Sequence, residues 1–125
     1  MKLIDFQNEA GYLELSKPLA RTSTVTGSAV DIRDYQGVLK ITQVVGAITG
    51  TPTLDGKIQD SADGSTGWAD VTGATFTQVV AADQIQSIGV DTRAVKRHIR
   101  YVGTIGGGSP NLSMAVHAVG QKQVI

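Results

Sequence analysis

Residues 53–79, TLDGKIQDSADGSTGWADVTGATFTQV, carry the pattern that decides the fold predicted from the sequence. In residues 54–58, leucine, glycine and isoleucine alternate with charged side chains, which is the period of a strand buried on one face. Residues 60–65 favour a tight turn, because aspartate accepts hydrogen bonds from nearby amides and glycine tolerates a positive φ. A second turn is expected at residues 72–74. The stretch therefore predicts three strands joined by two turns.

Two aromatic side chains in this stretch are predicted to anchor the core. Trp68 is the only tryptophan of the chain, and Phe76 follows it after the second turn. Aromatic side chains bury more apolar area than other residues, and this chain has few of them. We therefore expect Trp68 and Phe76 to lie in one core.

The strand pattern continues on both sides of this stretch. Residues 37–48 form the longest apolar run, which predicts a central strand covered on both faces, with Lys40 and Gln43 near its ends or rim. Turn residues interrupt the chain at intervals of about ten residues, and residues 50–52 and 106–111 are expected to be a turn and a loop. About eight short strands with this spacing predict an all-β fold, an antiparallel β-sandwich that is jelly-roll-like, with an immunoglobulin-like sandwich as the alternative.

The N-terminal residues do not share this pattern. Residues 1–22 are apolar but show neither a helical nor a strand period, and Pro18 prevents a helix from running through them. We predict an extended N-terminal arm over residues 1–22 and a β-sandwich domain over residues 23–125. The arm is too apolar for a free tail, so we expect it to pack along its own domain or on a neighbouring molecule.

Charge is balanced overall but is unevenly distributed along the chain. Residues 51–91 hold six aspartates and one lysine, which gives −5, and residues 92–125 hold five lysines or arginines and no acid, which gives +5. Two interpretations remain open. The two segments form neighbouring solvated faces, or the acidic loops of one subunit meet the basic strand of the next during self-assembly.

No residue pattern predicts catalysis, a cofactor or a metal. The chain has no cysteine, which excludes disulfides, thiolate nucleophiles and cysteine-ligated zinc. His98 and His117 have no metal ligand or acid at a suitable spacing, and no hydrolase or metalloprotease motif is present. The glycines of residues 103–108 precede a proline and another strand, so they do not resemble the phosphate loop at the start of a helix. We expect a protein that is not an enzyme.

Nucleic acid and membranes are not expected partners either. The basic residues 93–100 would lie on both faces of a strand, and the chain has no overall basic excess. No window approaches the 18 or so apolar residues of a membrane-spanning helix, and the first residues do not form a signal peptide.

An ordered series of turn and strand-edge segments resembles the small decoration, or cement, proteins encoded among the head genes of tailed bacteriophages. The segments lie between about residue 20 and residue 123: DIRDYQG at 31–37, GAITGTPTL at 46–54, QDSADGS at 59–65, Trp68, DVTG at 70–73, DTRAVKR at 91–97 and VGQK at 119–122.

This resemblance implies a non-enzymatic virion protein that binds the outer surface of an expanded capsid and stabilises it. It implies the major capsid protein as partner, a homo-oligomer with a trimer favoured, and a place on the capsid surface after assembly in the host cytoplasm. On this basis we expect the arm, especially Phe6, Tyr12, Leu13 and Leu15, to contact the capsid or a neighbouring subunit. We expect Asp63, Arg97 and Arg100 to form the contact between subunits.

The alternative function is a structural module of a phage tail or baseplate, or a carbohydrate-binding β-sandwich. If Trp68 is buried, only Tyr12, Tyr35 and Tyr101 remain as aromatic platforms for sugars, which counts against carbohydrate binding.

Overall fold

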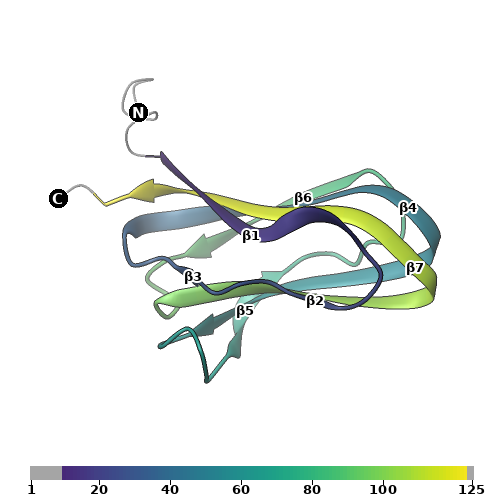
Figure 1. Ribbon diagram of the computed structural model, residues 1–125. Coiled ribbons are helices and arrows are strands. Elements are labelled where there is room, and N and C mark those ends of the chain that lie inside the picture. The colour runs from purple at the N-terminus through teal and green to yellow at the C-terminus, as the bar shows by residue number, and fades with distance from the viewer. Residues whose placement is uncertain (1–9, 124–125) are drawn as a thin grey trace.

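The computed structural model describes residues 10–123, and all regular structure in them is β (Figure 1). The strands are β1 (Ala10–Arg21), β2 (Val25–Thr26), β3 (Val30–Asp31), β4 (Tyr35–Ser61), β5 (Ala69–Thr75), β6 (Gln84–Asp91) and β7 (His98–Lys122). Every pair of neighbouring strands is antiparallel.

The long strands β4 and β7 pair with each other along nearly their whole length and bend together (Figure 1). On one side of the bend, the N-terminal half of β4 lies between β6 and the C-terminal half of β7. Strand β1 pairs with the other edge of that half of β7. On the other side of the bend, the C-terminal half of β4 lies between β5 and the N-terminal half of β7. The short strands β2 and β3 pair with that half of β7. One hydrogen-bonded sheet therefore folds into two layers, which confirms the prediction of an antiparallel β-sandwich.

The bend is formed by segments that were expected to be a turn and a loop. Gly50 in β4 and Gly107 in β7 have positive φ angles of 78° and 93°. A Cβ atom on Gly50 would overlap the carbonyl oxygen of Ser109, and one on Gly107 would overlap that of Thr51. Register shifts between Val45 and Thr51 let both strands change direction without losing their pairing. Continuous bent strands therefore replace the predicted turn at 50–52 and loop at 106–111.

The core lies between the two layers and includes residues from both. Its buried members are Leu15, Val25, Ile32, Tyr35, Leu39, Ile41, Val45, Leu54, Ile58, Ala74, Phe76, Val79, Val90, Ile99, Tyr101, Leu112, Met114, Val116 and Ala118. The alternation in residues 54–58 is as predicted, because Leu54, Gly56 and Ile58 are buried while Asp55 is exposed. Phe76 is buried and meets the Tyr101 ring edge-on, with 6.1 Å between ring centroids.

The prediction of a doubly covered strand over residues 37–48 is wrong in one respect. This segment has strands on both sides, but its outer face is exposed to solvent, and Val38 is 61% exposed. An antiparallel sheet in a sandwich covers only one of its faces. Gln43, expected near an end or rim, points into the core and is 1% exposed.

A buried hydrogen bond joins the two layers. The Tyr101 hydroxyl donates to Oε1 of Gln43 over 2.6 Å. Burial raises the pKa of the Tyr101 phenol well above its usual range, so the hydroxyl stays protonated and remains a donor. Gly56 leaves room for this pair, because a Cβ at that position would contact both side chains. The bond fixes the spacing between β4 and β7 across the core.

Part of the predicted arm belongs to the sandwich. Residues 10–21 form β1, which pairs with β7 from Ala10 opposite Gln121 to Arg21 opposite Leu112. Two register shifts in β1, at Glu14/Ser16 and Ser16/Leu19, hid its strand period from the sequence analysis. The stretch is therefore an edge strand of the same sheet and packs along its own domain. Residues 1–9 lie outside the described residues.

Trp68 is not a core anchor. It is half-buried at the end of the turn that leads into β5, and the Arg100 guanidinium carbon lies 4.3 Å from the centroid of its ring. A cation above an indole face is favourable where the ring reaches the surface, and this explains how a tryptophan is accommodated outside the core. Because Trp68 is partly exposed, it is an aromatic surface that a sugar can reach, contrary to the expectation that it is buried.

We expect Tyr101→Phe to lower the free energy of unfolding by about 1–3 kcal/mol, because Gln43 would keep a buried amide oxygen without a donor. Replacing both partners, as in Tyr101→Phe with Gln43→Leu, should restore most of the loss. Urea unfolding followed by circular dichroism measures both. Tyr12→Phe is the matched control, because Tyr12 is 64% exposed. A single mutant as stable as the wild-type protein would contradict a structural role for this bond.

Candidate interaction surface

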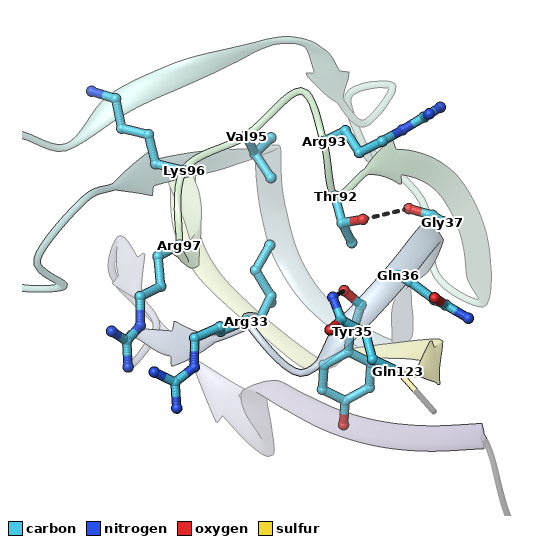
Figure 2. Close-up of a pocket in the computed structure, with 11 residues that line it drawn as sticks. Arg33, Tyr35, Gln36, Gly37, Thr92, Arg93, Val95, Lys96, Arg97 and Gln123 are labelled. Carbon is cyan, nitrogen blue, oxygen red and sulfur yellow. Dashed lines mark hydrogen bonds between the residues drawn. The ribbon is translucent and has the colours of Figure 1, made fainter. Parts of the chain in front are cut away.

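A basic pocket lies at the end of the sandwich opposite the bend. It is an open cavity of about 410 Å³ between residues 32–37, which lead from β3 into β4, and residues 92–97, which link β6 to β7. Thr92 closes one wall by donating its hydroxyl to the Gly37 carbonyl over 2.9 Å (Figure 2). The amide of Ile32 donates to the Arg97 carbonyl over 2.9 Å and ties the same two segments together on the other side.

Four cationic side chains surround this pocket: Arg33, Arg93, Lys96 and Arg97. We call these four residues the basic rim. In Figure 2 Arg33, Lys96 and Arg97 extend to one side of the view and Arg93 to the other, while the Tyr35 ring lies beside Gln123 and points away from these cations. The rim thus presents positive charge to solvent around a partly apolar floor.

Local acids orient parts of the basic rim. Arg97 donates to Oδ2 of Asp31 over 2.8 Å, and the amide of Arg33 donates to Oδ1 of the same carboxylate over 2.9 Å. The hydrogen bonds from Arg97 and from the Arg33 amide lower the pKa of Asp31 to about 2. Arg93 lies 3.4 Å from Asp91. Within residues 10–123, the Lys96 side chain makes no ion pair or hydrogen bond, so it is the cation most available to a partner.

The expected subunit-contact residues all have partners within the chain, and they do not form one cluster. Arg97 belongs to the basic rim. Arg100 lies in β7, where it donates to Oε1 of Gln59 over 2.8 Å and stacks on Trp68. Asp63 closes the turn before β5 by accepting from the amides of Ser65 and Thr66, and these hydrogen bonds lower its pKa. Each therefore has a structural role in its own molecule.

The expected arm contacts are divided between core and surface. Leu15 is 1% exposed and packs in the sandwich core, so it is not available as a contact with another molecule. Leu13 is partly buried against the same core. Tyr12 is exposed and stacks on His117, with 5.4 Å between ring centroids. Phe6 lies outside the described residues.

The described residues form no metal-binding cluster at the basic rim. They contain no cluster of three or more histidine, cysteine, aspartate or glutamate residues that could hold a metal ion. No helix long and apolar enough to cross a membrane occurs in that part of the chain. Cations around an open, partly apolar pocket are suited to ion pairing with an acidic surface of another protein.

Sequence analysis missed the basic rim because its members come from two distant segments. Residues 91–94 were expected to form a corner and the strand was expected to begin at Val95, whereas β7 begins at His98 and residues 92–97 form a loop that faces residues 32–37. The aspartate–arginine pair of residues 31 and 97 gave no local signal, because 66 positions separate its members. Only the strand order brings them together.

Comparison with known proteins shows the fold. No protein-family model and no curated protein sequence matches the chain. Two solved structures of infectious bursal disease virus proteins, one of the Gx strain and one of a VP2 subviral particle, match 91% of this chain with TM-scores of 0.60 and identities of 11% and 12%. A third, from the Gt strain, matches 88% with a TM-score of 0.52 and 15% identity.

The chain thus shares an antiparallel, jelly-roll-like β-sandwich fold with these virus proteins. It spans about a third of the length of the matched chains, 32% in two cases and 31% in the third. At this level of identity the likeness concerns the arrangement of strands. The jelly-roll-like sandwich is therefore favoured over the immunoglobulin-like alternative.

We expect Asp31→Asn to lower the free energy of unfolding at neutral pH by about 1 kcal/mol or less, because the ion pair with Arg97 is partly exposed. A carboxylate with a depressed pKa stabilises the folded state above its unfolded pKa, near 3.8 for Asp31, and loses that effect as the pH falls towards about 2. The difference between variant and wild type should therefore shrink over this range. Denaturant unfolding at several pH values measures it, with Asp34→Asn as the exposed control. A difference independent of pH would contradict the assignment.

Proposed function

We propose that this chain is a non-enzymatic structural protein of a virus particle, which binds the outer surface of the capsid and stabilises it. The likeness of its sandwich to viral capsid proteins over 91% of its length is the observation that carries the proposal. The basic rim offers charged contacts to a neighbouring protein. The sequence resemblance to decoration proteins of tailed bacteriophages supports the same role.

The partner in this proposal is the major capsid protein, with the chain acting as a homo-oligomer on the particle surface after assembly in the host cytoplasm. In this proposal each repeat of the capsid surface carries an acidic patch, and the basic rim of each bound molecule pairs with one patch. When several rims of one oligomer bind the same lattice, the effective concentration of the second contact is high. Modest affinity at each rim is then sufficient for stable decoration.

The location is tested by immunogold electron microscopy of particles produced from the genome that encodes this chain. An antibody raised against the chain should place gold over the particle shell. Gold confined to a tail would instead favour the tail or baseplate alternative, and particles without gold would overturn a virion role.

The basic rim is tested by reversing one charge. We expect Lys96→Glu to weaken binding to capsids that lack this protein by about tenfold or more, because an acidic surface would then meet a like charge. Co-sedimentation with such capsids at increasing protein concentration measures the affinity. Lys40→Glu is the matched control, because Lys40 is an exposed lysine on the outer face of β4, away from the rim. Equal losses in both variants, or none in Lys96→Glu, would contradict a role for the rim.

A further inference from the structure

Strand β6 is an unprotected edge of the sandwich. It borders the β1–β7–β4–β6 layer and pairs only with β4 among the described strands. The pairing is unbroken, from Asp91 opposite Val38 to Gln84 opposite Val45, with no bulge. Within residues 10–123, the backbone groups of residues 84–90 make no hydrogen bond to a backbone group outside β4. One side of this strand therefore keeps its backbone donors and acceptors available.

The opposite border of the same layer is protected. Strand β1 has two register shifts, and its sequence includes Lys17 and Pro18. Bulges, lysine and proline are the features that keep an edge strand from pairing with another chain. Residues 84–90, QIQSIGV, have none of these and carry no charge. Within this layer, β6 is therefore the edge that lacks the features that prevent pairing with another strand.

Side chains on the outer face of β6 are complementary to a second copy of the strand. Ile85, Ser87 and Gly89 alternate on that face, since their β4 partners Val44, Thr42 and Lys40 flank the inward-pointing Ile41 and Gln43. Ile85 is 72% exposed. Gly89 leaves an open position beside Val38, whose Cγ1 atom lies 3.1 Å from where a Cβ of residue 89 would be.

We propose that β6 strands of two molecules pair antiparallel about a twofold axis at Ser87, which joins the two sandwiches through one continuous sheet. In this register Ile85 of one molecule lies opposite Gly89 of the other and packs on its Val38, so two exposed apolar side chains per molecule are covered. The contact is self-complementary, as twofold symmetry requires. Asp83 and Asp91 lie just outside the paired segment. The Arg93 guanidinium lies 3.4 Å from the Asp91 carboxylate.

Strand β5 comes near the end of β6, where residues 71–74 and residues 89–91 line one cavity of about 190 Å³. The segment after β5 reaches β6 through Gln86, whose side chain accepts from the Thr77 amide and donates to the Thr77 carbonyl, both over 2.8 Å. Gln86 points to the inner side of the layer, so this contact lies behind the edge. Pairing of two copies through β6 is separate from binding of the basic rim to a capsid. It adds a twofold contact to the trimer that the sequence resemblance implies.

The absence of cysteine from the chain permits a direct test. In Ser87→Cys the two new thiols would face each other across the axis, at the separation of directly opposed residues in an antiparallel pair. Mild oxidation should give a covalent dimer of the 13.1 kDa chain on a non-reducing gel, lost on reduction. Leu19→Cys, on the protected edge, is the matched control and should remain mostly monomeric. Equal cross-linking of the two variants would overturn the proposal.

A second variant tests the contact without a disulfide. Ile85→Lys places a charge where Ile85 would pack on Val38 of the other molecule, and Leu19→Lys makes the same change on the other edge. Sedimentation velocity should show loss of the twofold association only in Ile85→Lys, with circular dichroism spectra unchanged in both. Association that survives Ile85→Lys, or a wild-type protein that never associates beyond single chains, would overturn the proposal.

Discussion

The antiparallel pairing of β4 with β7 is the constraint on which the rest of the structure depends. These two strands contribute to both layers, and every other strand pairs with one of them. Their shared bend at Gly50 and Gly107 sets how the layers face each other, and the Tyr101–Gln43 hydrogen bond fixes them across the core. The same pairing brings residues 32–37 next to residues 92–97, so the basic rim is a product of this ribbon rather than of any local motif.

Much of the fold could be predicted from the sequence because strand patterns are local. The alternation in residues 54–58 identified the second half of β4 and its buried face. The bend could not be recognised, because glycines that end a strand and glycines that bend two paired strands look the same in one sequence. Trp68 was misplaced for a related reason: its size suggested the core, whereas its partner Arg100 lies 32 positions away and is set by strand pairing.

The candidate site was less predictable than the fold. Charge segregation pointed to residues 92–100, but the structure shows that Arg97 and Arg100 already have partners, Asp31 and Gln59. Lys96 is the member of the basic rim whose side chain has none in the described chain. Sequence composition therefore identified the charged segment, and only tertiary pairing separates the cations that stabilise the domain from those that can meet another molecule.

The long reach of the β4–β7 ribbon also determines when this domain can form during synthesis on the ribosome. Ser61 pairs with His98, but Tyr35 pairs with Lys122, so the ribbon closes its shortest loop at one end and its longest at the other. Loop-closure entropy favours zipping from the Ser61–His98 end through the bend. The first half of β4, and β1 with it, must wait for residues 112–122 to leave the exit tunnel. Until then the nascent chain carries apolar strands that have no partner, and unpaired apolar strands of this kind are prone to aggregate.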